Sequence, residues 1–259
     1  MKYLVIIQAR CGSSRLPGKV MKDLCGEPML LRMIERVQRS NAIDEVMVAT
    51  TIEREDLPVV ALCAEHNIRV FSGSENDVLD RFYQAARLLD PEFVVRLTGD
   101  CPCVDPLVLD QAIAAMDESS DYLAMSSKTF PDGMGVEIVR FSALEKSWRE
   151  ANLKSEREHV TQYIIKHKDL FACQDFVSPL GFHGDERWTV DEPEDFELIT
   201  KIFENFFKDG VVIPFEYGDI LRFLDANPEL RKINSCYSRD EGLAKSLRED
   251  CVVKLTGCS

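Results

Sequence analysis

Residues 3–19 read YLVIIQARCGSSRLPGK, an apolar run followed at once by a loop of small and basic residues. The apolar run predicts a buried strand. In the loop, Gly12 and the two serines after it let backbone N–H groups approach an anion, and Arg10, Arg15 and Lys19 add positive charge. The segment predicts a phosphate-binding loop after a strand; a solvated basic turn after an edge strand is the alternative.

The charge of this loop is opposite to that of the whole chain. Residues 1–22 contain five Lys or Arg and no Asp or Glu, whereas the 259 residues together carry a formal net charge of -14. Neutralisation of phosphates dominates nucleic-acid binding, so an acidic protein is a poor partner for it. We therefore expect no nucleic-acid partner, although a nucleotide can bind at one basic site.

Length and composition indicate one large α/β domain with a small appendage. Hydrophobic residues make up 45% of the chain and charged residues 29%, which is typical of a globular protein. The apolar run at 3–7 is much shorter than the ~20 residues that span a bilayer, and no signal segment opens the chain. We expect no membrane partner and a cytoplasmic location, with most of the nine cysteines reduced.

Apolar strand patterns alternate with helical patterns through the first half of the chain. This alternation is typical of βαβ units and predicts a mostly parallel sheet that is covered by helices on both faces. The expected strands are 3–7, 46–49, 68–71 and 93–97, and the expected helices are 29–39, 57–66, 78–89 and 107–116.

The pattern changes after about residue 120, which indicates an inserted substrate or dimerisation region at about 128–170. We expect one main domain over 1–227 and a tail with a short helix over 228–259. The expected strands are 122–126, 136–139, 171–177 and 188–190, and the expected helices are 143–150, 158–167, 193–207, 220–226 and 241–247.

The opening loop matches neither of two common nucleotide-binding motifs. A P-loop reads G-x-x-x-x-G-K-[ST], but here five residues separate Gly12 from Gly18, and Val20 after Lys19 has no hydroxyl for Mg²⁺. The dinucleotide pattern G-x-G-x-x-G is absent as well. A different phosphate loop remains, at the carboxyl end of the first strand, where open α/β sheets bind ligands.

Two further segments offer carboxylates at the ends of strands. Asp100 follows the apolar run that ends in Thr98, and Asp191 follows 188–190, so both are candidate Mg²⁺ ligands. Asp100 could instead cap the helix that follows Asp105. The first-turn acids after Asp191, namely Glu192, Glu194 and Asp195, suit the N-terminus of a helix. A zinc site at Cys101-Pro102-Cys103 has only weak support from its spacing.

Together these segments resemble the cytidylyltransferase family that activates acidic sugars, the 3-deoxy-manno-octulosonate and acylneuraminate type, and most closely its SpsF-like branch. The motifs that carry the resemblance are IIQARCGSSRLPGKVM, GEPML, SENDVLDRF, RLTGDCPCVDP, REHVTQYI, RWTVDEPEDFELI and EGLAKSL, in this order. The resemblance implies an α/β Rossmann-like nucleotidyltransferase fold, a glycosyltransferase-A-like three-layer sandwich. It also implies CTP and Mg²⁺ as substrate and cofactor, and a homodimer.

The resemblance also assigns site residues. It implies that the nucleotide is contacted by Ala9, near the base, and by Arg10, Gly12, Ser13, Ser14, Arg15, Lys19 and Arg81. It implies catalytic roles at the phosphates for Arg15, Lys19 and Asp100, and Mg²⁺ ligands at Asp100 and Asp191. The residues that it places near the acceptor are Asp132, Gly133 and Glu137. Arg81 could instead be an ion-pair partner on a helix surface. His159, in the family-typical segment REHV, is a candidate for contact with the substrate or a second subunit, and the alternative is a helix residue packed at an interface or in the core.

The resemblance predicts Mg-dependent transfer of CMP from CTP to an acidic sugar or a related acceptor, with release of pyrophosphate, in surface glycan biosynthesis. Acidic-sugar specificity does not carry over, because Gln8 and Ser14 stand where the sialate and octulosonate enzymes more often have Pro and Lys. Alternatives are transfer from another NTP to a sugar phosphate, or a noncatalytic nucleotide-binding subunit of a glycan assembly complex.

Overall fold

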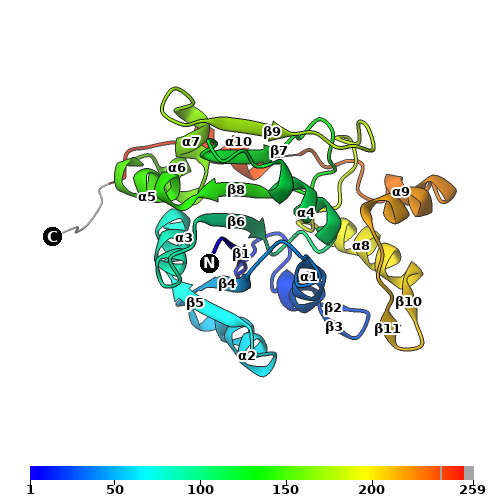
Figure 1. Cartoon of the computed structure of the whole chain (residues 1–259). Helices are drawn as coiled ribbons and strands as arrows, with labels where there is room; N and C mark the ends of the chain where they lie inside the picture. The colour runs from blue at the N-terminus through cyan, green and yellow to red at the C-terminus, as the bar shows by residue number, and fades with distance from the viewer. Residues whose placement is uncertain (240, 254–259) are drawn as a thin grey trace.

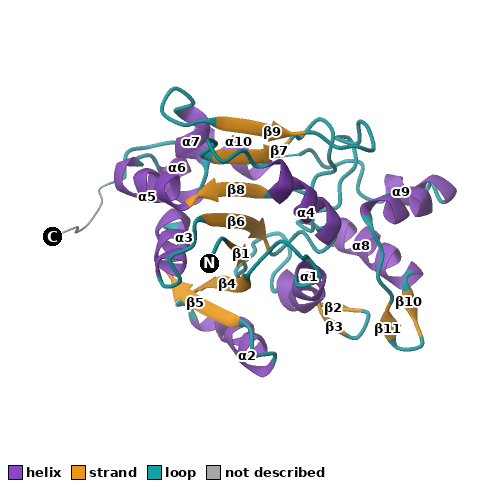
Figure 2. Cartoon of the chain, in the orientation of Figure 1, coloured by secondary structure: helices purple, strands orange, loops and turns teal. Residues whose placement is uncertain are grey.

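A seven-stranded, mostly parallel sheet forms the centre of the protein (Figures 1 and 2). The computed structural model describes residues 1–239 and 241–253. The strand order is β5-β4-β1-β6-β8-β7-β9, and only β8 runs antiparallel to its neighbours. The strands are β1 (Tyr3–Gln8), β4 (Glu45–Thr51), β5 (Arg69–Gly73), β6 (Phe93–Thr98), β7 (Tyr122–Met125), β8 (Glu137–Arg140) and β9 (Cys173–Phe176).

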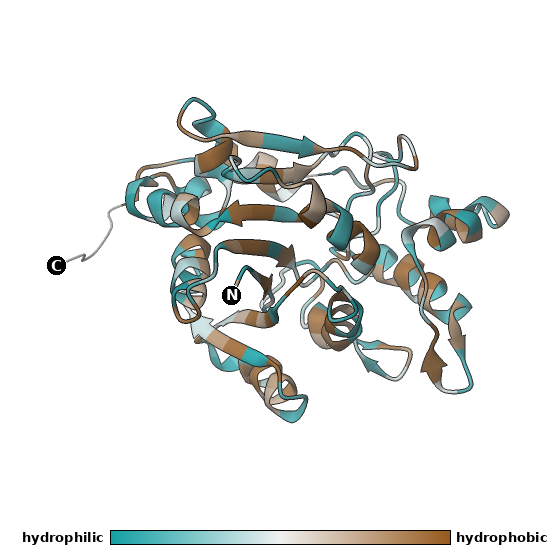
Figure 3. Ribbon diagram, viewed as in Figure 1, coloured by the Kyte–Doolittle hydropathy of each residue, from teal (hydrophilic) through white to brown (hydrophobic). Residues whose placement is uncertain are grey.

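Helices cover both faces of the sheet, so the predicted three-layer α/β fold is confirmed. Successive side chains of β1 point to opposite faces: Val5 and Ile7 join one hydrophobic cluster, and Leu4 and Ile6 join the other. The central strands are correspondingly brown in Figure 3. The first cluster includes residues of α1 (Met29–Val37), α2 (Leu57–Glu65), α4 (Pro106–Ala115), α8 (Pro193–Asn205) and α9 (Tyr217–Ala226); the second includes residues of α3 (Val78–Arg87), α5 (Phe141–Glu150) and α7 (Gln162–Lys166).

The single helix predicted at 158–167 is wrong, because the chain leaves helical geometry between α6 (Lys154–Glu158) and α7. His159 has φ −111° and ψ 71°, and the Thr161 hydroxyl donates a hydrogen bond to Glu137 Oε1 at 2.7 Å. The helical pattern of apolar residues continues through this break, so the sequence did not reveal it.

The strand predicted at 188–190 is also wrong. Its backbone bonds to two different segments instead of one partner strand: Trp188 N–H donates to Asp132 O at 2.6 Å, and Val190 N–H donates to Asp100 O at 2.8 Å. The apolar side chains are buried as expected, but no ladder forms. Two short hairpins were also not predicted, β2 (Asp23–Leu24) with β3 (Glu27–Pro28) and β10 (Phe207–Lys208) with β11 (Val211–Val212). The same holds for three 3-10 helices, at Lys19–Met21, Arg54–Asp56 and Leu230–Lys232.

The end of the chain returns to the main domain. The predicted helix at 241–247 is confirmed as α10 (Glu241–Arg248), which lies beside α6 (Figure 1). Residues 240 and 254–259 of the predicted tail lie outside the described residues. Across residues 1–239 and 241–253, every helix is too short or too polar to cross a lipid bilayer.

Candidate functional site

The loop after β1 is held in one shape by its own backbone. Gly18 N–H and Ser13 N–H both donate to Cys11 O, at 2.9 and 2.8 Å, and Cys11 N–H donates to the Asp56 carboxylate at 2.6 Å. Gly18 has φ 68°, a left-handed conformation that glycine adopts without strain, and a 3-10 helix starts at Lys19. The amides of Gly12 and Ser14 donate to no acceptor in the part of the chain that the structure describes, so they can serve a ligand.

The ends of β1 and β6 approach each other closely below this loop. Gly99 N–H donates to Gln8 O at 2.7 Å, and a side chain at Gly99 would place its Cβ 2.9 Å from the Cβ of Ala9. A glycine is therefore required here for steric reasons. The close approach brings Asp100, one residue later, under the loop that carries Lys19.

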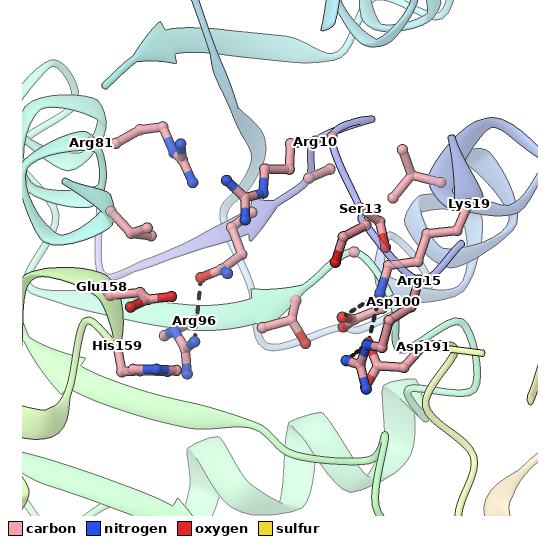
Figure 4. A pocket seen from close by; sticks show the side chains of 18 residues that line it. Arg10, Ser13, Arg15, Lys19, Arg81, Arg96, Asp100, Glu158, His159 and Asp191 are labelled. Atoms are coloured by element: carbon pink, nitrogen blue, oxygen red, sulfur yellow. Dashed lines mark hydrogen bonds and ion pairs between the residues drawn. The ribbon is translucent and has the colours of Figure 1, made fainter. Parts of the chain in front are cut away.

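Lys19 joins the two predicted metal carboxylates. Its Nζ lies 3.1 Å from Asp100 Oδ2, 2.9 Å from Asp191 Oδ1 and 2.7 Å from Val190 O (Figure 4). Arg15 also contacts Asp191, at 3.0 Å, and it reaches Glu192 at 3.2 Å. Residues from three distant parts of the chain therefore meet around one ammonium nitrogen.

Electrostatics keep this cluster charged. Burial disfavours the Lys19 ammonium, but Asp100 and Asp191 outweigh burial and raise the pKa of Lys19 above its usual value. Burial likewise disfavours the Asp100 carboxylate, but Lys19 and hydrogen bonds from Thr98, Lys19 and Cys101 outweigh it and lower the pKa of Asp100 to about 2. Asp100 is therefore an anion, and Lys19 a cation, at neutral pH.

Two further arginines, Arg81 and Arg10, add positive charge to the wall of the pocket that Lys19 lines. Arg81 is only 2% exposed; its NH1 donates to Ser74 O at 2.7 Å, and its Nε has no hydrogen-bond partner in the described residues. Burial and the neighbouring Arg10 lower the pKa of Arg81 to about 10, which leaves it protonated at neutral pH. Arg81 is thus a buried cation at the edge of the cavity (Figure 4), not an ion-pair partner on a helix surface.

The structure distinguishes the acidic residues that cap helices from those that face Lys19. Asp105, not Asp100, caps α4, because its carboxylate accepts hydrogen bonds from Leu107 and Val108 N–H. Glu192 is the N-cap of α8, and Asp195 accepts hydrogen bonds from the Asp191 and Glu192 amides, in a capping box. The carboxylates of Asp100 and Asp191 face Lys19 instead.

The predicted site residues line two adjoining pockets. The smaller pocket, of about 320 Å³, contains every residue predicted to contact the nucleotide or the metal: Ala9, Arg10, Gly12, Ser13, Ser14, Arg15, Lys19, Arg81, Asp100 and Asp191. The larger pocket, of about 490 Å³, contains the three predicted acceptor residues: Asp132, Gly133 and Glu137. Arg15, Asp100 and Asp191 line both pockets. The group of Lys19, Asp100 and Asp191, called the Lys19 cluster below, therefore lies at the junction of the pockets.

Glu137 lies in the wall of the larger pocket. The register of β6 against β8 pairs Arg96 with Glu137, and their side chains form an ion pair. Glu137 also accepts hydrogen bonds from the hydroxyls of Tyr122 and Thr161. Burial opposes its ionisation, but Arg96 and these donors outweigh burial and lower the pKa of Glu137. Glu137 therefore fixes Arg96, which lines both pockets.

Arg187 organises the opposite wall and was not predicted from the sequence. Its guanidinium contacts both oxygens of Asp195 at 2.9 Å, Asp132 Oδ2 at 3.0 Å and Asp191 Oδ2 at 3.4 Å. These carboxylates outweigh the burial of the side chain and raise the pKa of Arg187. Arg96 was not predicted either. The Arg96–Glu137 and Arg187–Asp132 contacts join residues 41 and 55 positions apart, so no local pattern in the sequence shows them.

Gly133 lies at a point in the pocket wall where the backbone leaves no room for a side chain. It has φ +94°, and a Cβ there would lie 2.3 Å from Thr189 N and 2.4 Å from Trp188 C. We expect Gly133→Ala to lower the free energy of unfolding by at least ~2 kcal/mol, because both the conformation and the contact exclude a side chain. Urea unfolding measures this loss.

Gly135→Ala is the matched control for that experiment. A Cβ at Gly135 meets no atom within 4 Å, so its stability is expected to stay close to that of the wild type. Equal stabilities of the two alanine variants would contradict the packing described for Gly133.

His159 lies at the junction of the pockets and lines both of them. It follows α6 at the helix break, so it is not the packed mid-helix residue that the sequence left as one interpretation. Its neighbour Glu158, which lines the smaller pocket, accepts a hydrogen bond from Ser246 Oγ at 3.0 Å.

The donor set fits Mg²⁺ better than zinc. Two aspartates converge at the phosphate loop, and Mg²⁺ binds typically through one or two carboxylates together with phosphate oxygens and water. Over residues 1–239 and 241–253, no three His, Cys, Asp or Glu side chains are grouped to hold a metal by themselves. The weakly supported zinc site at Cys101 and Cys103 therefore lacks further protein ligands in the described residues.

A family model and related proteins match most of this chain. A family model described as cytidylyltransferase matches residues 4–216. An uncharacterised protein of Methanocaldococcus jannaschii is 38% identical over 238 residues, which cover 91% of this chain and 95% of that protein. The spore coat polysaccharide biosynthesis protein SpsF of Bacillus subtilis is 35% identical over 239 residues, 87% of this chain and 95% of SpsF.

Among solved structures, a cytidylyltransferase from Leptospira borgpetersenii superimposes with a TM-score of 0.82 at 32% identity. The match covers 89% of this chain and 96% of the Leptospira chain. These findings confirm the resemblance that the sequence motifs indicated. The chain belongs to the cytidylyltransferase family.

Proposed function

We propose that this protein is a Mg-dependent enzyme that transfers CMP from CTP to a hydroxyl group of an acidic sugar or a related acceptor, with release of pyrophosphate. The observation that carries the proposal is the Lys19 cluster: an ammonium joined to Asp100 and Asp191, below a loop with available amides, at the junction of two pockets. The name of the relative SpsF supports a role in surface polysaccharide synthesis.

In this proposal the acceptor oxygen attacks the α-phosphorus of CTP, the bond to the β-phosphate breaks, and pyrophosphate leaves. The smaller pocket would hold the triphosphate, with the Gly12 and Ser14 amides and Arg15 as donors to its oxygens. Lys19 would stabilise negative charge that develops on the transferred and leaving phosphates. The reaction needs charge neutralisation and positioning, which these residues supply without a nucleophilic side chain.

Asp100 and Asp191 would hold the Mg²⁺ ion, which when bound would neutralise phosphate charge and orient the α-phosphate. The Asp100 carboxylate stays ionised at neutral pH, as a metal ligand must. Binding of CTP would also bring phosphate oxygens to the cations Arg15 and Lys19, which in the free protein contact the aspartates.

The larger pocket would hold the acceptor. It adjoins the Lys19 cluster through Asp100 and Asp191, so an acceptor bound there could present an oxygen to the α-phosphate. Its walls pair Arg96 with Glu137 and Arg187 with Asp132, which gives polar partners for a hydroxyl-rich molecule.

Pyrophosphate release tests the proposal directly. We expect release that requires Mg²⁺, is fastest with CTP among the four ribonucleoside triphosphates, and requires an acceptor from a panel of acidic sugars and sugar phosphates. Mass spectrometry is expected to detect a CMP-linked product. Faster turnover with another triphosphate would overturn the assignment of the base. Tight CTP binding without turnover, for any acceptor and metal, would favour a noncatalytic nucleotide-binding subunit. Sedimentation analysis of the same preparation tests the homodimer that the family resemblance implies.

A further inference from the structure

The C-terminal segment, residues 234–239 and 241–253, lines part of the larger pocket and is anchored near both of its ends. At its start, Asn234 Nδ2 donates to Arg187 O at 3.0 Å and to Asp195 Oδ1 at 2.9 Å. Asn234 is 3% exposed. The segment therefore begins directly on the residues that build one wall of the pocket.

The far end of the segment is fixed to α6. Asp250 accepts hydrogen bonds from Ser155 N–H at 2.9 Å and from Ser155 Oγ at 2.7 Å. Lys154 N–H donates to Cys251 O at 2.8 Å, and Leu153 pairs with Val252 in an antiparallel bridge. These bonds fix the far end of the segment at the start of α6.

The middle of the segment lines the pocket between these anchors. Four of its residues line the larger pocket: Ser238, Arg239, Gly242 and Leu243. Arg239 NH1 donates to Ser127 O and Phe130 O, both at 2.9 Å, which ties this part to the loop after β7. None of these four residues lines the smaller pocket.

Two observations distinguish these four residues from the residues of the smaller pocket. The family match ends at residue 216, so all four residues lie beyond the part of the chain that the family model matches. Gly242 leaves open space, because a Cβ there would meet no atom within 4 Å. The segment thus lines the pocket at Gly242 with a position that has space for the first atom of a side chain.

We infer that the C-terminal segment is a specificity wall of the acceptor pocket, which selects acceptors by their size at the end that lies away from the phosphates. This inference rests on the proposed function, since it takes the larger pocket as the acceptor site. The chemical class of ligand is a hydroxyl-bearing acidic sugar, and the segment sets how far such a molecule extends from the Lys19 cluster.

Two substitutions of opposite sense test the wall. Gly242→Trp adds a large side chain in the open space, and we expect it to raise the KM for the longest accepted acceptors by roughly 10-fold or more, with a smaller change for short ones. Leu243→Ala removes volume from the wall, and we expect it to improve kcat/KM for acceptors longer than the preferred one. The KM for CTP is expected to change less than about 2-fold in both variants.

A matched control keeps the result interpretable. Arg248→Ala removes a charge from the exposed end of α10, outside both pockets. It is expected to show wild-type selectivity. Thermal unfolding of each variant checks that the fold is intact.

The outcomes distinguish the two proposals. If the wild-type protein releases no pyrophosphate with any acceptor, the proposed function fails. If the wild type is active but neither Gly242→Trp nor Leu243→Ala changes the ranking of acceptors by length, the inference about the wall is overturned while the proposed function stands. Equal losses for all acceptors and for CTP would also overturn it, since a general structural defect acts on both substrates.

Discussion

Lys19→Ala is expected to lower kcat for pyrophosphate release by roughly 10²- to 10³-fold, the range seen when one preorganised group that stabilises transition-state charge is removed. The Lys19 ammonium is buried, and its contacts with Asp100, Asp191 and Val190 O hold it in one position. Asp100→Asn is expected to lose activity to a similar extent, because the amide carries no charge for Mg²⁺ or Lys19. Steady-state kinetics with CTP measure both effects.

The control for this pair is Lys201→Ala, which removes an exposed lysine paired with Glu204 on α8. Its activity is expected to match the wild type, since exposed ion pairs contribute little to stability. Lys19→Met retains most of the side-chain volume and separates loss of charge from loss of packing. Near-normal pyrophosphate release by a folded Lys19→Met or Asp100→Asn protein would refute the assigned roles.

Arg187→Met is expected to destabilise the protein by about 3–5 kcal/mol, the cost of removing one partner from a buried ion-pair network. The guanidinium contacts Asp132, Asp191 and Asp195, and Asp195 is fully buried. Without Arg187 these carboxylates keep their desolvation cost and lose their cation. Activity is expected to fall as well, because Asp191 loses a partner that positions it.

The pH dependence of that loss identifies its cause. Burial raises the pKa of Asp195, but Arg187, two backbone amides and Asn234 outweigh burial and lower it below its usual value of 3.8. The stability from this lowered pKa is present above 3.8 and is lost as the pH falls through the lower folded-state value. The difference between wild type and Arg187→Met is therefore expected to shrink as the pH falls below 3.8.

Urea unfolding at pH 7 and at pH 3 measures this difference, with Arg222→Met as the control at an exposed arginine whose side chain is 74% accessible. A difference that is the same at both pH values would mean that the loss comes from packing and not from the carboxylates.

The first half of the fold could be predicted from the sequence because its strands are continuous apolar runs. In β1 all four residues Leu4–Ile7 are fully buried, and such a run has one interpretation in an alternating α/β pattern. The loop after β1 could be singled out as a candidate phosphate loop because its residues are consecutive in the chain. The same holds for Asp100, which follows a strand directly.

The second half could not be predicted as well, because its structure depends on contacts between distant segments. The pairing of Arg96 with Glu137 follows from the register of β8 against β6, which no local pattern reveals. The helix break at His159 and the irregular segment 188–190 depend on Thr161 and Trp188 bonding to β8 and to Asp132. Arg187 contacts Asp191 and Asp195 nearby in the chain, but its contact with Asp132 joins segments 55 residues apart.

The hydrogen bond from Lys19 to the Val190 carbonyl also constrains when during synthesis the protein can become active. It joins residues 171 positions apart, and Lys19 reaches Asp191 across 172 positions. Contacts of such high sequence separation form slowly, because a long loop must close before they contribute. A nascent chain that has not yet released residue 191 from the ribosome therefore lacks half of the carboxylates around Lys19, and the centre is completed only after most of the polypeptide has been made.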